Sequence, residues 1–365
     1  HLCTAAEHLP PRRTNNLLFY CPLRHSHSLN LPKSDDNSIL FFARFELQFV
    51  PLFLMTLKFT DISKRYGNRW ALRDVSFEAE TGRVIGIYGL NGAGKTSLLR
   101  IAAGVEEVNS GTLEAPPAFF LPTFPETSLF ERLRGFRLDT AELAAMQSAK
   151  INEALKSDAK LLCLDDPFRF FDAGERRQAM EKLRTAARDS GKLILFATNS
   201  FEQILGFADD LLVLVGGYLG QHGPASEVYN SPLTAAVASV TGRCNIFEAR
   251  RLTSSKTDLP EFHTIEGGHR LFTGPLDRTR LGPINKNIPL AIRPEYISLS
   301  FGASFPEDNL LKAIVTEVSF LGPMTLVRLD AGGLELEALV LRLIGLNVGE
   351  ECMVGLPPNR ITVLS

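Results

Sequence analysis

A glycine-rich segment near residue 90 carries the clearest chemical signal in the sequence. It reads Gly-Leu-Asn-Gly-Ala-Gly-Lys-Thr and fits the phosphate-binding pattern G-x-x-x-x-G-K-[ST] at every position. Glycines here let successive backbone N–H groups converge on a phosphate, and the positive end of a following helix adds to the attraction. We expect Lys95 to reach the β- and γ-phosphate oxygens of ATP or GTP, and the Thr96 hydroxyl to bind Mg²⁺. The residues expected to contact the nucleotide here are Gly89, Asn91, Gly92, Ala93, Gly94, Lys95, Thr96 and Ser97.

Two adjacent carboxylates follow a second apolar run. Residues 160–164 are mostly apolar and end in Asp165 and Asp166. At the C-terminal end of a parallel strand, Asp165 is expected beside the phosphate-binding loop, where it helps to hold Mg²⁺. We expect Asp166 to orient or deprotonate the attacking water. The alternative is that the two acids cap the next helix.

Strands and helices of a parallel α/β fold are predicted around these motifs. The apolar run at residues 83–88 predicts a buried strand before the glycine loop, and residues 97–103 predict a helix after it. Residues 192–198 predict another buried strand, and residues 211–221 predict a hairpin with a two-glycine turn. The sequence therefore predicts an α/β P-loop nucleotide-binding domain.

Length, charge and cysteine content exclude several classes of protein. The chain has 365 residues, which favours two or three domains with real hydrophobic cores. Lys and Arg number 39 against 41 Asp and Glu, so the net charge of −2 gives no positive field for nucleic acid or anionic membranes. The five cysteines are scattered without a C-x-x-C pair, which favours a reducing cytosol over a disulfide framework or a zinc site. No run of eighteen uncharged apolar residues is long enough to cross a bilayer.

The first 54 residues differ from the rest of the chain. They hold four of the seven histidines and show no helical or strand period, whereas alternating strand-like sequence begins at Met55. We expect Met55 to be the true start and residues 1–54 to lie outside the fold, as upstream sequence read through. The alternative is that His1, His8, His25 and His27 bind a metal, but no ligand spacing recurs among them.

The order of these motifs resembles the ATP-binding subunits of ABC transporters. Tyr66 lies at the position of the family's adenine-stacking aromatic residue, and residues 71–77 are similar to the strand before the loop. Residues 167–172 look like the loop whose Asp contacts a partner subunit. Asn199 lies where the family has a switch histidine, so the resemblance implies that Asn199 and Asp166 position the attacking water.

The C-terminal third narrows the resemblance to one group of importer ATPases. It is similar to the accessory OB-like, TOBE-type domain of spermidine, iron and sugar importer ATPases at residues 242–247, 292–300 and 318–322. Alternating runs separated by Gly and Pro turns predict a small all-β barrel, with strands at residues 312–320, 324–330, 334–340 and 361–364. Without an interleaved basic and aromatic stripe, a dimerisation or regulatory module is favoured over one that binds nucleic acid or oxyanions. We expect an ABC-type ATP-binding domain at residues 55–240 and the OB-like regulatory domain at residues 242–365.

Two segments depart from the family pattern. The interval between the two motif strands is too short for the family's helical subdomain, which docks on the permease, so coupling to transport is expected to be altered or lost. Residues 119–124 lack the glutamine that the family places near the γ-phosphate. Residues 143–147 are the best remnant of its Leu-Ser-Gly-Gly-Gln signature, and a plain amphipathic helix at residues 140–156 explains them equally well.

Two catalytic positions also differ from the family. Asp166 stands where the family has Glu and is one methylene shorter, and a misplacement of about 1 Å can lower a rate roughly a hundredfold. Asn199 replaces a histidine, so it can donate a hydrogen bond but cannot carry a proton. These changes predict hydrolysis that is slow, absent or dependent on a more complete partner subunit.

The resemblance implies an importer ATPase subunit that is cytoplasmic and peripheral on the inner face of the cell membrane, with ATP and Mg²⁺ as cofactors. Its implied partners are integral-membrane permease subunits and a second ATP-binding subunit, with no nucleic acid. The lost motifs leave open an alternative, a nucleotide-binding regulatory protein without turnover whose state is read through the OB-like domain. A P-loop protein that acts on nucleic acid is disfavoured by the net charge.

Overall fold

The computed structural model describes most of the chain after residue 55. The described ranges are residues 56–123, 139–252, 259–276, 281–301, 308–341 and 345–365. The predictions for residues 1–54, including the metal alternative for their histidines, lie outside the described residues, as does residue 124. No helix within these ranges combines the length and apolarity needed to cross a bilayer.

A six-stranded sheet forms the centre of the α/β region. Its order is β5-β6-β7-β3-β8-β9, and all neighbours pair in parallel except β8 and β9. The bounds are β3 (Val84–Tyr88), β5 (Ala118–Leu121), β6 (Leu161–Asp165), β7 (Leu193–Ala197), β8 (Asp210–Val215) and β9 (Tyr218–Pro224). The predicted buried strands and hairpin are confirmed: β6 and β7 are buried along their whole length, as expected for strands covered on both faces.

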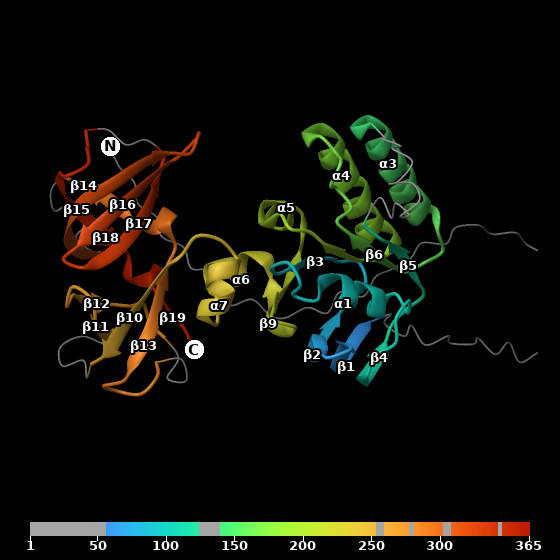
Figure 1. Ribbon diagram of the computed structural model, residues 1–365, viewed down its shortest axis with the longest axis horizontal. Coiled ribbons are helices and arrows are strands. Elements are labelled where there is room, and N and C mark those ends of the chain that lie inside the picture. Colours follow the sequence, from blue (N-terminus) through green and yellow to red (C-terminus); the bar gives the residue numbers. More distant parts are fainter. Residues whose placement is uncertain (1–55, 124–138, 253–258, 277–280, 302–307, 342–344) are drawn as a thin grey trace, which may run out of the picture. The chain divides into compact units, whose positions relative to one another are not determined.

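One face of this sheet is covered by a helix and a smaller sheet. Helix α1 (Lys95–Ala102) and the antiparallel sheet β2-β1-β4 share one apolar core with that face. The strands are β1 (Leu57–Tyr66), β2 (Arg69–Ala79) and β4 (Ser110–Glu114). Figure 1 shows them on the side of the six-stranded sheet opposite α3 and α4. Helix α1 begins two residues before the predicted helix because the Leu98 N–H already donates to the Gly94 carbonyl, at 2.9 Å.

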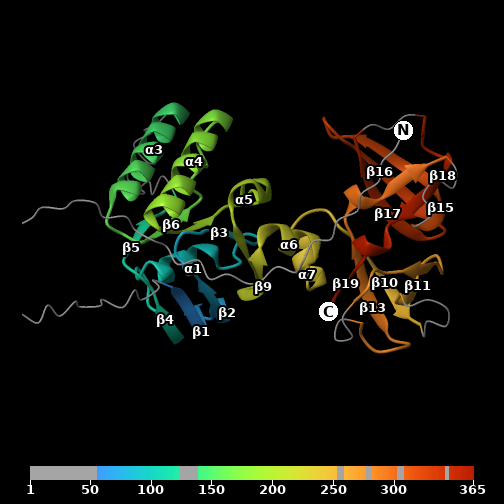
Figure 2. The same ribbon diagram turned by 180° about the vertical axis from the view of Figure 1, so that it is seen from behind.

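The other face packs against a layer of helices, two of which are longer than α1 (Figure 2). The helices of this region are α3 (Thr140–Lys156), α4 (Ala173–Ser190), α5 (Phe201–Phe207), α6 (Ala225–Asn230) and α7 (Ala235–Val240). The prediction of a helix over residues 140–156 is confirmed at both ends. Asp139 and Glu142 form a capping box at the start of α3, and Asp172 and Glu175 do the same for α4. The alternative that Asp165 and Asp166 cap the next helix is therefore wrong, because Asp172 occupies the N-cap of α4.

The C-terminal region is all-β, as predicted. The strands of the first sheet, in the order β12-β11-β10-β13-β19, are β10 (Asn245–Arg251), β11 (Glu261–Thr264), β12 (Arg270–Phe272), β13 (Asn287–Ile292) and β19 (Thr362–Val363). Those of the second, in the order β14-β18-β15-β16-β17, are β14 (Ser298–Ser300), β15 (Asn309–Phe320), β16 (Thr325–Ala331), β17 (Leu334–Val340) and β18 (Glu351–Leu356). Two 3-10 turns, η1 (Pro294–Tyr296) and η2 (Pro358–Arg360), join the sheets. Apolar side chains from both sheets form one shared core.

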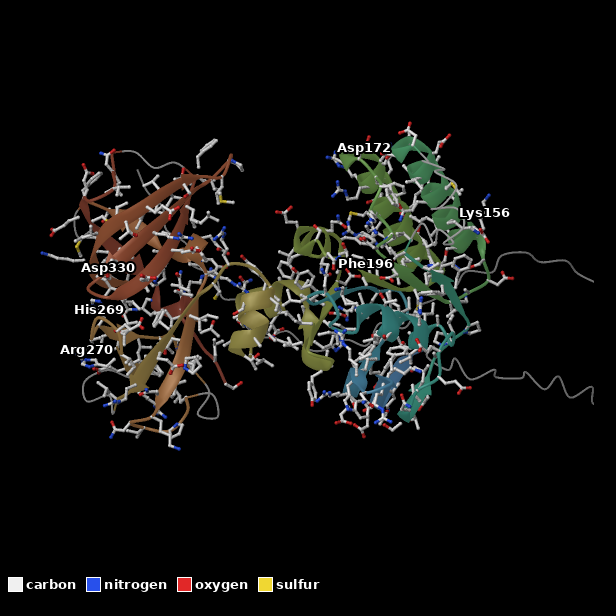
Figure 3. The ribbon with its side chains drawn as sticks, in the orientation of Figure 1. Lys156, Asp172, Phe196, His269, Arg270 and Asp330 are labelled. Atoms are coloured by element: carbon white, nitrogen blue, oxygen red, sulfur yellow. The ribbon has the colours of Figure 1, made fainter. Side chains whose placement is uncertain are left out.

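Polar side chains connect the two β-sheets, and two of them reach from the central strand of one sheet to an edge strand of the other. The Asn245 amide on β10 donates to the Glu337 carbonyl on β17 at 2.9 Å, and the Asn309 amide on β15 donates to the Phe272 carbonyl on β12 at 2.9 Å. The His269 ring lies 2.6 Å from the carbonyl of Ala331, the neighbour of Asp330, and Figure 3 shows His269 and Asp330 close together. Because these groups are satisfied by one another, the two sheets are held in a fixed register.

A buried arginine fixes the segment between the α/β region and the all-β region. Arg293 is 3% exposed, and its guanidinium donates to the carbonyls of Tyr229, Ala238 and Arg243 at 2.9, 3.1 and 3.0 Å. It also donates to the Thr241 hydroxyl at 2.8 Å and lies 4.2 Å from the centre of the Tyr229 ring. The planar fork of arginine suits this set of converging acceptors better than a lysine ammonium would.

Candidate nucleotide-binding site

The C-terminal ends of parallel strands bring the predicted site residues together at one edge of the six-stranded sheet. The glycine loop follows β3, Asp165 ends β6, and Asn199 follows β7. These segments line a cavity of about 500 Å³. Ten of the predicted residues lie on its wall: Tyr66, Asn91, Gly92, Gly94, Lys95, Thr96, Ser97, Asp165, Asp166 and Asn199. The other two, Gly89 and Ala93, are not among the residues that line it.

The glycine loop needs glycine at two of its positions for steric reasons. Gly94 has a φ of 106°, and a Cβ atom there would lie 2.4 Å from the Ala71 carbonyl oxygen. Gly92 has a φ of 80°, and a Cβ there would lie 2.7 Å from Nη2 of Arg69. Both conformations fall in the left-handed region that side chains with a Cβ disfavour. The loop therefore keeps its backbone N–H groups accessible because it carries no side chains at these positions.

Lys95 is held against the loop that it follows. Its ammonium donates to the Gly89 carbonyl at 2.7 Å and the Leu90 carbonyl at 3.2 Å. Burial lowers the pKa of this ammonium, and the carboxylates of Asp165 and Asp166 oppose that effect. The charge thus lies at the cavity wall on two backbone carbonyls, which the oxygens of a phosphate could replace with a fully charged partner.

Thr96 and Asp165 form the pair that would hold a metal ion. The Thr96 hydroxyl donates to Oδ2 of Asp165 at 2.8 Å, and both residues line the cavity. One hydroxyl and one carboxylate leave several positions for phosphate and water oxygens, which is the arrangement that Mg²⁺ favours at nucleotide sites. The chemistry of this donor set fits Mg²⁺.

Asp166 adopts an unusual backbone conformation beside this pair. Its φ is 49°, in the left-handed region that Asp and Asn enter more readily than other side chains. Burial raises the pKa of its carboxyl group, the Arg169 guanidinium opposes that rise, and the Asp165 carboxylate adds to it. The Asp166 N–H donates to the Ala197 carbonyl at 2.8 Å, which ties this residue to the end of β7. A raised pKa favours a group that accepts a proton, as a general base must.

Thr198 is a buried neighbour of Asp166 to which the sequence analysis gave no role. Its hydroxyl lies 3.5 Å from Oδ1 of Asp166 and donates to Oε1 of Gln203 at 3.2 Å. Asn199, the next residue, is exposed and lines the cavity. Thr198 directly follows a buried strand, and that position was the only sign in the sequence that it could belong to the site. A strand end alone does not show which side chain points inward.

Gln147 on α3 supports the loop that follows Asp166. Its side chain is buried, and its Nε2 donates to the Asp166 carbonyl at 3.2 Å while its Oε1 accepts from the Phe170 N–H at 3.4 Å. Gln147 does not line the cavity, so its place in this chain is to brace the loop between β6 and α4. From the sequence alone, Gln147 was only the last residue of a signature remnant.

Tyr66 lies at the outer rim of the cavity. Its ring is 46% exposed, and its hydroxyl donates to Oε2 of Glu106 and lies 3.2 Å from Oγ of Ser97. Partial burial raises the pKa of this hydroxyl, and the hydrogen bond to Glu106 adds to the rise. A half-exposed ring at a polar rim is available for stacking on a planar base.

Six further residues line the cavity without having been predicted to contact a nucleotide, and besides Ala71, Ala197 and Thr198 they are Arg69, Thr123 and Arg169. Arg69 comes from β2, Thr123 follows β5, and Arg169 lies between β6 and α4. Thr123 lies at the same sheet edge as Asp165, in the segment where the resemblance led us to look for a glutamine. These positions depend on how three loops fold, which no periodicity reveals.

Two family models match this chain. The model described as "ABC transporter" matches residues 72–123, and the one described as "TOBE domain" matches residues 290–364. The first match covers most of β2, then β3, the glycine loop, α1, β4 and β5. The second covers most of the all-β region. Both agree with the two families that the motifs suggested.

Similar proteins extend the likeness to nearly the whole length of curated relatives. A molybdate/tungstate import ATP-binding protein of Pyrococcus abyssi is 26% identical over 84% of this chain and 99% of its own. A spermidine/putrescine import ATP-binding protein of Methylococcus capsulatus is 27% identical over 75% of this chain and 82% of its own. A solved structure of an ATP binding subunit of an ABC transporter is 21% identical, covers 47% of this chain and 91% of that chain, and has a TM-score of 0.40. The chain therefore matches the ABC transporter family at residues 72–123 and the TOBE domain family at residues 290–364, and it is related over most of its length to the molybdate/tungstate and spermidine/putrescine importer ATPases.

Proposed function

We propose that this chain couples ATP binding and slow hydrolysis to the import of a solute. The observation that carries the proposal is the convergence of the glycine loop, the Thr96–Asp165 pair and Asp166 on one cavity. Residues 55–240 would form the ATP-binding domain and residues 242–365 the regulatory domain. The named relatives import molybdate/tungstate or spermidine/putrescine, and we place the cargo of this chain in one of these two classes.

Each cavity residue takes a defined part in nucleotide binding. Tyr66 stacks on the adenine, and the glycine loop directs its N–H groups at the phosphates. Lys95 exchanges its two carbonyl partners for β- and γ-phosphate oxygens. Thr96 and Asp165 hold Mg²⁺, which when bound neutralises charge on those oxygens.

Asp166 and Asn199 act on the attacking water. The Asp166 carboxylate accepts the water proton, which its raised pKa favours, and the Asn199 amide donates a hydrogen bond to hold the water or the phosphate in place. An Asp reaches about one methylene less far than a Glu, and a misplaced base can lower the rate roughly a hundredfold. Turnover is therefore slow, although binding is intact.

ATP turnover by the full chain tests this proposal. We expect slow phosphate release by the wild type, none by Lys95→Ala or Asp166→Ala, and faster release by Asp166→Glu, which restores the longer reach. All variants should keep the far-UV circular dichroism of the wild type. Turnover that survives Lys95→Ala would contradict the assignment of the glycine loop.

The partners follow from the proposed importer role. The chain would act at the inner face of the cell membrane, bound to permease subunits and paired with a second ATP-binding subunit. The second candidate is a regulatory protein that binds ATP without turnover, which the Asp and Asn at positions 166 and 199 favour. Co-purification with a membrane protein from the native cell supports the importer. A water-soluble complex in which ATP stays intact supports the regulator.

A further inference from the structure

Arg169 is a cation on the cavity wall that takes no part in the mechanism above. It lies in the loop between β6 and α4, three residues after Asp166, and its side chain is exposed. No ion pair within 4 Å engages its guanidinium among the described residues. The guanidinium lies 5.6 Å from the centre of the Phe170 ring, a contact that does not neutralise its charge. Because no carboxylate pairs with it in the described residues, that charge can act on a ligand in the cavity.

The backbone that carries Arg169 is firmly anchored. Its own N–H donates to the Asp166 carbonyl at 3.4 Å, and the next N–H donates to the buried side chain of Gln147. Phe168 and Phe171, on either side, are buried in the apolar core under α4. Asp172 then caps α4 (Figure 3 labels it). The Cα of Arg169 is therefore fixed at the cavity wall, while its long side chain can reorient.

The position of Arg169 along the cavity indicates which part of ATP it faces. In the proposed site, Tyr66 would mark the adenine end, and the Thr96–Asp165 pair would hold Mg²⁺ at the phosphate end. Arg169 comes from the same loop as Asp166, on the side of the attacking water. Arg69, the other unassigned arginine, lies instead beside Gly92 in the glycine loop. Arg169 is thus at the end of the cavity that receives the outermost phosphate.

We propose that Arg169 binds the γ-phosphate of ATP from within the same chain, as a positioning residue that distinguishes ATP from ADP. The inference rests on the proposed nucleotide site. Without nucleotide, the Arg169 guanidinium and the Asp166 carboxylate line the same cavity. With ATP bound, the Arg169 side chain turns to the γ-phosphate oxygens, to which a guanidinium can donate two parallel hydrogen bonds. In the signature remnant at residues 143–147 both glycines and the serine are missing, and Arg169 supplies positive charge to the γ-phosphate without them.

Paired affinities for a non-hydrolysable ATP analogue and for ADP test this inference. The full chain is measured with Mg²⁺ and either adenosine 5′-[β,γ-imido]triphosphate or ADP. We expect Arg169→Ala to weaken the triphosphate about tenfold or more and ADP less than about twofold. Arg169→Lys keeps the charge without the fork and should fall between the two. Arg177→Ala, which removes an exposed arginine of α4 outside the cavity, is the matched control and should change neither affinity.

Two results would overturn the inference, and they are distinguishable from a failure of the nucleotide site itself. If Arg169→Ala weakens the triphosphate and ADP equally, Arg169 has only a general electrostatic effect. If Arg169→Ala and Arg169→Gln bind both nucleotides as tightly as the wild type does, Arg169 is only a solvated side chain. If the wild type binds neither nucleotide, the proposed function fails together with the inference. If the wild type binds both nucleotides and Lys95→Ala binds neither, the nucleotide site stands, and the affinities of the Arg169 variants alone decide the inference about Arg169.

Discussion

Asp166 combines a left-handed backbone conformation with a half-buried carboxylate. Such conformations cost about 1–3 kcal/mol and persist where the surrounding structure holds them. Here the Ala197 carbonyl accepts from the Asp166 N–H and the Gln147 side chain donates to the Asp166 carbonyl, so the backbone is held on both sides of the Asp166 Cα. The strain places a carboxylate directly beside the Thr96–Asp165 pair. In the proposed function, stability is exchanged for a proton acceptor at this position.

Asp166→Asn should make the nucleotide-free protein more stable at neutral pH. Because the pKa of Asp166 is raised in the folded chain, the folded state holds this proton more tightly than the unfolded state, and stability falls as pH rises through the raised pKa. Asn keeps the left-handed preference and carries no charge. We expect the Tm at pH 7 to rise by roughly 1–3 °C. The gain should vanish in acid, where Asp166 is protonated. A gain that persists there would mean that charge burial is not its cause.

Gly94→Ala should destabilise the fold as well as the site. The added Cβ would meet the Ala71 carbonyl at 2.4 Å in a left-handed conformation. We expect a loss of about 2–4 kcal/mol in urea unfolding, together with the loss of nucleotide binding. Gly191→Ala is the matched control, because Gly191 has a φ of 62° with open space around it and should lose only about 1 kcal/mol. Equal losses in the two variants would contradict the steric explanation.

At the scale of elements, the loop between β6 and α4 connects the cavity to the helical layer. It begins at the metal-binding strand end, passes Arg169 at the cavity wall and ends in the capping box of α4. The resemblance assigned Asp172 a contact with a partner subunit, and the structure shows this side chain accepting the Glu175 N–H at 2.7 Å. A change at Asp172 therefore acts first on the helix.

Replacement of Asp172 separates capping from partner contact. Asp172→Ala should lose about 1 kcal/mol of unfolding free energy, whereas Asp172→Ser keeps a capping oxygen and should lose almost none. Thermal unfolding of the two variants measures this difference. ATP-dependent dimerisation of Asp172→Ser, followed by light scattering, then reports the partner contact alone. If Asp172→Ala unfolds like the wild type, the cap does not stabilise α4.

The nucleotide site was more predictable from sequence at its motifs than at its loops. The strand, glycine loop and helix around Lys95 could be predicted because phosphate binding fixes residue type at every position of the motif. The helix at residues 140–156 followed from its amphipathic pattern, and its limits are confirmed. The roles of Arg169, Thr198 and Gln147 could not be predicted, because they depend on which way a side chain leaves an irregular loop or a helix packed on it. Hydrogen bonding between distant segments has no local sequence signal.

At the scale of the whole molecule, a buried arginine ties the all-β region to the helices that precede it. Arg293 directs its guanidinium at four protein oxygens in the segment from Tyr229 to Arg243. Removal of the side chain would leave buried carbonyls without donors, and each such group costs about 1–3 kcal/mol.

Arg293→Met should therefore destabilise the chain by about 3 kcal/mol or more. Arg243→Ala is the control, since its exposed ion pair with Glu337 contributes less than about 1 kcal/mol. Urea unfolding followed by tyrosine fluorescence and by circular dichroism measures both variants. A small effect of Arg293→Met would show that water or other side chains satisfy the carbonyls.

Equilibrium binding of ATP with Mg²⁺ to the full chain, wild type beside Lys95→Ala, is the most direct measurement of whether this cavity is a nucleotide site. We predict saturable binding by the wild type and a loss of at least about a hundredfold in affinity for Lys95→Ala, because a half-buried ammonium on phosphate oxygens has no substitute in the glycine loop. Both proteins should unfold at similar temperatures. Equal ATP affinity in the two proteins, or no binding in the wild type, would contradict the assignment.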